Sequence, residues 1–229
     1  NSLTYSILII LLKCPSFCGL SQEAAKLESA SELPCPVANS RLTSSLLKIA
    51  GLLEEGGVCG IPTDTVYALA ASCKNPQAIE KIYNIKDRPA EKPICICISN
   101  VEQLVTAKPP FTPLLWEFMR NVYPGGISCI VSKGDWLFRL VINIQLTFQF
   151  ILISFSCVGD SIMIRVPDHT VTGHLCNITG PLAITSANPS GEPDTCRTLF
   201  TGTITIVREG CVPAVKVQQI FDRVKSTMV

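Results

Sequence analysis

Basic and polar side chains gather in two short segments that lie far apart in the chain. Lys86 and Arg88 place an ammonium and a guanidinium on one side of a turn, and Lys92 adds a third cation shortly afterwards. Ser186 and Asn188 offer a hydroxyl and a carboxamide in a small loop. Lysine and arginine neutralise phosphate oxygens and donate charge-assisted hydrogen bonds to them, which a polar loop can supplement. The two segments together predict a site for a triphosphate.

A third polar segment, Thr63-Asp64-Thr65, follows an apolar run that is typical of a buried strand. In open α/β sheets, ligand groups gather where strands end. The hydroxyls and the carboxylate are suited to orienting a small polar substrate or a metal-bound phosphate. Threonine and aspartate are equally common in turns, where they bond only to nearby backbone groups. Spacing alone leaves both interpretations open.

Hydrophobic patterns predict the elements that position these segments. Apolar residues at helical spacing predict a helix that begins at Ala38 and ends before Gly56, and further helices over 76–88, 112–122, 170–176 and 212–224. Short apolar runs predict strands over 58–62, 93–99, 127–132, 162–166, 182–185 and 203–207. Strands separated by helices indicate the α/β class, with a mixed sheet flanked by helices. Lys86 and Arg88 then lie at a helix end, since the residue before a proline avoids the helical region.

Composition favours one folded domain without a strong overall charge. The 229 residues suffice for one sizeable core, and with 47% hydrophobic and 16% charged residues we do not expect extensive disorder. The net charge of +1 gives no general reason to expect nucleic-acid binding, so any basic groove must be local.

The twelve cysteines do not form a recognisable metal site. No Cys-x-x-Cys pair is present, and only His169 and His174 are available to complete a zinc site, so we expect none. Cys95 and Cys97 lie in an apolar run, where both side chains would share one face of a strand. Free thiols in a reducing compartment are the favoured interpretation.

The first 36 residues show no sustained period and contain Pro15, Pro34 and Pro36. We therefore assign 1–36 to a leader, disordered or targeting, and 37–229 to the domain. The apolar run from Ser6 to Leu12 is too short for a membrane-spanning helix, and no basic stretch precedes it as in a signal peptide.

The ordered set of motifs resembles the YrdC family. The motifs are Pro62-Thr63-Asp64-Thr65-Val66-Tyr67, Lys86-x-Arg88, Lys92-Pro93, Tyr123-Pro124-Gly125, Arg165-Val166-Pro167 and Thr185-Ser186-Ala187-Asn188-x-Ser190-Gly191. The resemblance runs from about Ala38 to Pro193 and resumes near Thr203. It implies a single domain with a twisted mixed α/β sheet and a basic groove. It also implies a nucleotidyltransferase that condenses L-threonine, bicarbonate and ATP into threonylcarbamoyl-AMP and releases pyrophosphate, with Mg²⁺ accompanying the nucleotide.

The resemblance also implies roles for individual residues. Thr63 and Arg165 are implied for L-threonine. The residues implied for the nucleotide are Lys86, Arg88, Lys92, Ser128, Ser186, Asn188 and Arg208. Ser128 stands where the family usually has threonine, and it keeps the hydroxyl. No general base is evident, so no further catalytic residue and no metal ligand are assigned.

The partners that the resemblance implies belong to transfer-RNA modification. A downstream threonylcarbamoyl transferase complex would move the group to adenosine 37 of transfer RNA. Contact with transfer RNA or double-stranded RNA is a further implied property, and membrane association is not expected. The expected compartment is the cytosol or the mitochondrion.

Two segments, 138–160 and 194–202, depart from the family pattern. In the segment from Val141 to Val158, apolar residues alternate with polar ones between Ile142 and Phe150, and this period of two predicts a strand rather than a membrane helix. After Asp194 only 195–202 precede the last predicted strand, so the Ser-Thr segment with which the family closes over threonine is missing.

These departures leave open an alternative of a different class. A catalytically impaired variant could keep the groove as a nucleotide-, RNA- or partner-binding module. A related enzyme that makes carbamoyl-adenylate for hydrogenase maturation is disfavoured, because such proteins carry acylphosphatase and zinc-finger regions that this sequence lacks.

Overall fold

The computed structural model describes residues 6–8, 37–39, 42–87, 94–141, 160–187 and 196–228. Three of the predicted nucleotide-binding residues, Arg88, Lys92 and Asn188, lie outside these ranges. The strand predicted from Val141 to Val158 also falls outside them, except for Val141, which ends a helix. Within the described ranges, no helix combines the length and the apolar character needed to cross a membrane.

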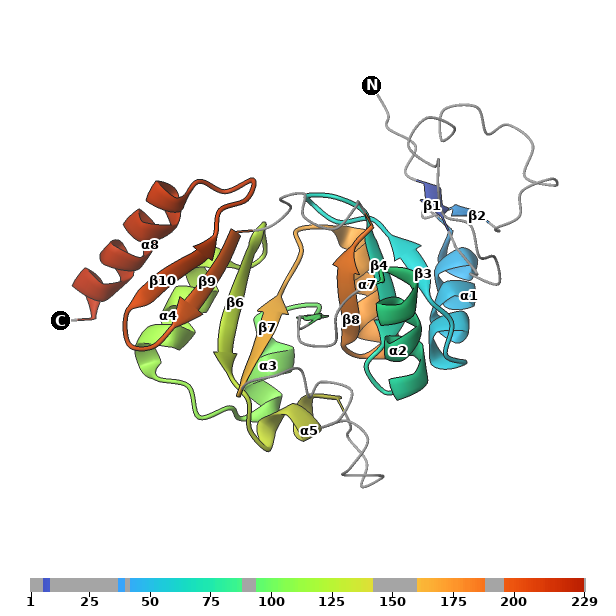
Figure 1. Ribbon diagram of the computed structural model, residues 1–229, viewed down its shortest axis with the longest axis horizontal. Helices are drawn as coiled ribbons and strands as arrows, with labels where there is room; N and C mark the ends of the chain where they lie inside the picture. Colours follow the sequence, from blue (N-terminus) through green and yellow to red (C-terminus); the bar gives the residue numbers. More distant parts are fainter. Residues whose placement is uncertain are drawn as a thin grey trace.

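An eight-stranded mixed sheet forms the centre of the fold, with the strand order β10-β9-β6-β7-β5-β8-β4-β3 (Figure 1). The strands of this sheet are β3 (Cys59–Ile61), β4 (Ala68–Ser72), β5 (Cys95–Cys97), β6 (Ile127–Ser132), β7 (Ser161–Arg165), β8 (Leu182–Ser186), β9 (Cys196–Phe200) and β10 (Ile204–Arg208). β5 pairs with β7 in parallel, as does β6 with β9, and the other neighbours are antiparallel. The predicted mixed α/β sheet is confirmed.

Helices cover both faces of this sheet. They are α1 (Thr43–Glu54), α2 (Pro76–Ile85), α3 (Val101–Ala107), α4 (Pro113–Val122), α5 (Trp136–Val141), α7 (Thr170–Thr179) and α8 (Ala214–Thr227). Alternate strand residues point to opposite faces, and each face has its own hydrophobic core. Buried residues of α1 and α7 belong to one core, and those of α2, α3, α4, α5 and α8 belong to the other.

Capping residues explain why the predicted starts of two helices are confirmed. The Asn75 side chain accepts a hydrogen bond from the Ala78 amide at 3.1 Å, and Pro76 occupies the first turn of α2. The Thr112 hydroxyl caps α4 in the same way, accepting from the Leu115 amide at 3.2 Å.

The start predicted for the first helix is wrong. α1 begins at Thr43 rather than at Ala38, because Val37–Asn39 is a strand, β2, that pairs antiparallel with β1 (Ser6–Leu8). A partner strand so distant in sequence leaves no local signal. The assignment of 1–36 to a leader stays a prediction.

Two strands of the sheet were missed. β4 is built from mostly small residues that are all buried, so it shows no alternation of apolar and polar positions. β9 lies within the segment 194–202, where we expected only a short loop; it pairs instead with β6 and β10. α3 and α5 were also not predicted, and both are short.

Candidate functional site

The Thr63-Asp64-Thr65 segment forms a tight turn between β3 and β4. The Thr63 hydroxyl donates to the Val66 carbonyl at 2.6 Å and accepts from the Thr65 amide at 3.2 Å. It also lies 3.2 Å from the Thr65 hydroxyl. Local backbone bonding therefore accounts for Thr63, as one of the two interpretations of this segment requires.

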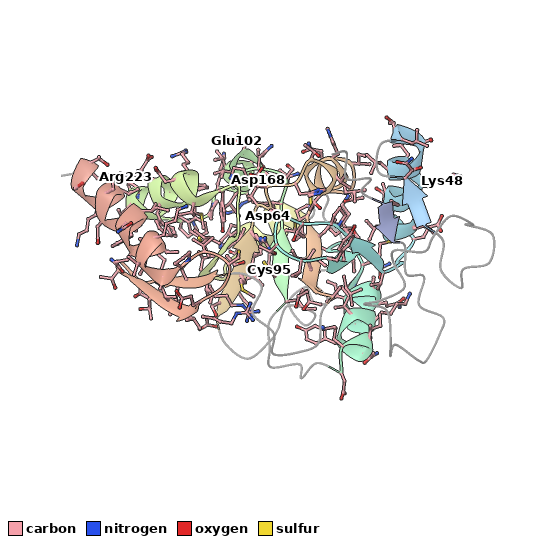
Figure 2. The ribbon with its side chains drawn as sticks, turned by 90° about the horizontal axis from the view of Figure 1, so that it is seen from above. Lys48, Asp64, Cys95, Glu102, Asp168 and Arg223 are labelled. Atoms are coloured by element: carbon pink, nitrogen blue, oxygen red, sulfur yellow. The ribbon has the colours of Figure 1, made fainter. Side chains whose placement is uncertain are left out.

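Asp64 makes a contact outside the turn, an ion pair with Arg165, which lies at the end of β7. The Arg165 Nη2 donates to the Asp64 Oδ1 at 2.7 Å and to the Thr65 Oγ1 at 3.1 Å, while its Nε donates to the Gly125 carbonyl at 3.2 Å. Arg165 is only 3% exposed. The guanidinium therefore fixes the Thr63-Asp64-Thr65 turn, called the threonine turn below, to the Pro-Gly turn that precedes β6. Figure 2 shows Asp64 near the middle of the molecule.

Gly126 allows a close approach between this turn and the C-terminal part of the chain. A Cβ atom at this position would lie 2.7 Å from the Cys211 Sγ and 3.3 Å from the Thr65 Cγ2. The loop between β10 and α8, which carries Cys211, therefore packs beside the Thr63-Asp64-Thr65 turn. A Cβ atom at Gly126 would therefore force the Cys211 side chain to shift.

Ser186, the last residue of β8, is brought to the same edge of the sheet. It is the register partner of Ala68, and the next amide, that of Ala187, donates to the Tyr67 carbonyl at 2.7 Å. The structure thus brings together Thr63, Arg165 and Ser186, which the sequence places in three separate motifs.

Lys86 occupies the C-cap of α2, as predicted. α2 packs on β4, the strand that follows the threonine turn. The helix end presents this cation from an element next to the site, and the helix dipole favours a positive charge there.

Ser128 begins a row of polar side chains that crosses three strands. It is the register partner of Arg197 on β9, and Arg197 is the partner of Arg208 on β10. Ser128 is 1% exposed. The sequence did not indicate Arg197, because this residue lies in a segment that we expected to be a loop. Only the assignment of β9 as a strand reveals it.

Burial makes the thiols of Cys59 and Cys95 unreactive. Burial raises the pKa of Cys59 and of Cys95 from 9.0 to about 12. At Cys95, Cys97 raises the pKa further, and the positive charges of Arg165 and Arg197 lower it only in part. These thiols stay protonated at neutral pH, so they are not candidate nucleophiles.

A labelling experiment checks this arrangement. Iodoacetamide at pH 8 is expected to modify the exposed Cys211 in the native chain and to leave Cys59 and Cys95 unmodified until urea unfolds it, as read by peptide mass spectrometry. Unfolding returns both thiols to a pKa near 9.0, so their contribution to stability is present below about pH 9 and is lost as the pH rises towards 12. Equal labelling rates for Cys59 and Cys211 would contradict the structure.

Comparison with known proteins identifies the family of this chain. The family model Sua5_yciO_yrdC, described as "Telomere recombination", matches residues 51–199. A protein of Pseudomonas aeruginosa named threonylcarbamoyl-AMP synthase is 30% identical over 144 residues, which are 63% of this chain and 70% of that protein. A Bacillus subtilis protein of the same name is 32% identical over 65% of this chain and 39% of its own length.

The fold has a solved counterpart. The crystal structure of Pyrococcus abyssi Sua5 complexed with L-threonine superposes with a TM-score of 0.65 at 20% identity, covering 77% of this chain and 57% of the other. The family match contains the threonine turn, Arg165 and Ser186, and it ends in β9. The chain therefore belongs to the Sua5/YciO/YrdC family.

Proposed function

We propose that this chain forms threonylcarbamoyl-AMP from L-threonine, bicarbonate and ATP and releases pyrophosphate. The observation that carries the proposal is the meeting of the Thr63-Asp64-Thr65 turn, Arg165 and Ser186 at one edge of the sheet. The names of the relatives support the same activity. In this reaction the threonine amine captures bicarbonate, with loss of water, to give a carbamate. A carbamate oxygen then attacks the α-phosphorus of ATP, and pyrophosphate leaves.

Positioning and charge neutralisation are the protein's main contributions to such a reaction. We assign Thr63 and Arg165 to the threonine side of the site. Because Arg165 is buried and bonded to Asp64, Thr65 and Gly125, we propose that it acts by holding the turn in shape. Direct contact between Arg165 and the threonine carboxylate stays a prediction.

The nucleotide side is assigned to cations and small polar groups on neighbouring elements. These residues are Lys86, Arg88, Lys92, Ser128, Ser186, Asn188 and Arg208. ATP would arrive with its own Mg²⁺ as part of the substrate. No cluster of metal-ligating side chains occurs in the described ranges, and the Asp64 carboxylate is paired with Arg165. We therefore assign no protein ligand to the metal ion.

The product is a reactive mixed anhydride, so a transferase must consume it. We propose the threonylcarbamoyl transferase complex of transfer-RNA modification as that partner. This step rests on the family resemblance and on the names of the relatives.

Pyrophosphate release tests the synthase activity. It is expected to require both L-threonine and bicarbonate, and omission of either should reduce it to background. A purified chain that binds ATP but releases no pyrophosphate would instead favour the nucleotide-binding module. That outcome would leave the family membership untouched.

Substitution of the predicted cations tests the nucleotide side. Lys86→Ala and Arg88→Ala are each expected to weaken ATP binding by about 1–3 kcal/mol, the loss typical of a charge-assisted hydrogen bond. Isothermal titration calorimetry measures this directly. Lys48→Ala is a suitable control, because Lys48 is an exposed residue on α1 at the far end of the molecule (Figure 2). Unchanged affinity in both test variants would mean that these cations are only a solvated helix end.

A further inference from the structure

We propose that Arg197 and Arg208 form a guanidinium pair that binds the phosphate chain of the nucleotide. This inference rests on the proposed function, and it adds a residue that the family motifs do not include. Arg197 lies on β9, in the segment where the sequence departs from the family pattern.

Strand register brings the two arginines to the same face of the sheet. Arg197 is the direct partner of Arg208 across β9 and β10, and Ser128 on β6 is its partner on the other side. Side chains of directly opposed residues lie side by side on one face. Neighbouring strands are about 4.8 Å apart, so both guanidinium forks can reach one phosphate chain.

A β-bulge is what turns Arg208 to this face. Between the Ile206–Thr198 pair and the Arg208–Arg197 pair, β10 advances by two residues while β9 advances by one. Without the extra residue, Arg208 would follow Ile206 towards the core that contains α4 and α8. The bulge directs it instead beside Arg197, and bulges of this kind often re-aim a side chain next to an active site.

The surroundings of Arg197 favour the binding of an anion. Among the described residues, Arg197 takes part in no ion pair, and its buried Nε has no hydrogen-bond acceptor. Its neighbour in register is a second cation, Arg208. Burial lowers the pKa of Arg197 from 12.5, which reflects the cost of keeping this charge away from water. Buried charges are normally paired, and phosphate oxygens would supply the missing partner.

The pair is continuous with the site already described. The positive charges of Arg165 and of Arg197 both lower the pKa of the Cys95 thiol, so the thiol lies near both guanidinium groups. Cys129 is the register partner of Ile164, which places the neighbouring Ser128 next to Arg165. Figure 2 shows Cys95 near the middle of the molecule, as it does Asp64. The row from Ser128 to Arg208 therefore starts beside Arg165 and leads away from the threonine turn, where the phosphate chain of a bound nucleotide would extend.

Binding measurements on the full chain test this proposal. Arg197→Gln is expected to weaken ATP and inorganic pyrophosphate binding by about ten-fold each, because it removes charge-assisted hydrogen bonds to phosphate. Adenosine binding is expected to be unchanged. Arg197→Lys keeps the charge but loses the fork, so its loss should be about three-fold. Arg223→Gln, at an exposed position of α8, should bind all three ligands as the original chain does.

The possible outcomes separate this inference from the synthase proposal. Unchanged ATP and pyrophosphate affinity in Arg197→Gln would overturn the guanidinium pair, even if threonine-dependent pyrophosphate release is observed. Loss of affinity in a chain that makes no product would support the pair and remove the synthase activity. If Arg197→Gln does not fold, the Arg197→Lys variant decides. If that variant binds ATP and pyrophosphate as tightly as the original chain does, the proposal is overturned.

Discussion

Arg165→Met is expected to lower the free energy of unfolding by about 3 kcal/mol, the lower end of the range for breaking a buried ion pair. The substitution leaves the Asp64 carboxylate, whose side chain is 16% exposed, without its counterion. It also removes the hydrogen bonds to Thr65 and to the Gly125 carbonyl. Urea denaturation followed by circular dichroism gives the change directly.

A double-mutant cycle separates the ion pair from the other contacts of Arg165. Asp64→Asn keeps an oxygen that can accept from Arg165, so it should cost only about 1 kcal/mol, as for a weakened hydrogen bond. Combining it with Arg165→Met should cost less than the sum of the single changes, because no carboxylate is then left without its counterion. Additive losses would show that the two side chains do not interact as the structure places them.

The same variants have a functional consequence under the proposed activity. Because Arg165 holds the threonine turn, Arg165→Met should raise the KM for L-threonine more than the KM for ATP. Arg165→Lys keeps the charge but not the fork that contacts Asp64, Thr65 and Gly125 together. Compared with Arg165→Met, it is therefore expected to recover part of the free energy of unfolding but to leave the KM for L-threonine almost as high.

Local signals explain which parts of the fold were predictable. β6 was predicted with its observed bounds, because a Pro-Gly-Gly turn precedes a mostly apolar run. α2 and α4 were predictable because Asn75 and Thr112 are strong caps, each followed by proline. These features act within a few residues, so they can be read without knowledge of the tertiary structure.

The parts that were not predictable depend on distant partners. The Asp64–Arg165 pair joins residues 101 positions apart, and neither side chain indicates the other. β9 has Arg197 on one face and Thr198 on the other, so its sequence resembles a polar loop until β6 and β10 are placed beside it. The site was therefore predicted as a set of motifs, whereas the contacts among them required the fold.

Phe221→Ala is expected to lower the free energy of unfolding by about 3–4 kcal/mol, as for other large-to-small changes in a core. Phe221 is 3% exposed and joins α8 to α4 and β9. Its ring centroid lies 5.8 Å from that of Phe118 and 6.1 Å from that of Phe200, and both contacts are edge-to-face. Val215→Ala on the same helix is the control, because Val215 is 68% exposed and should change stability very little.

The loss should be concentrated at the edge of the sheet that carries the arginine pair. β10 is an edge strand of the sheet, and α8 covers the core face of β9 and β10. In native-state hydrogen exchange, Phe221→Ala should therefore reduce the protection of amides in β9 and β10 more than that of amides in β5 and β8. Uniform loss across the sheet would mean that the edge unfolds only with the whole domain. Selective loss would show that α8 holds Arg197 and Arg208 in register, so nucleotide affinity should fall in this variant although Phe221 touches no ligand.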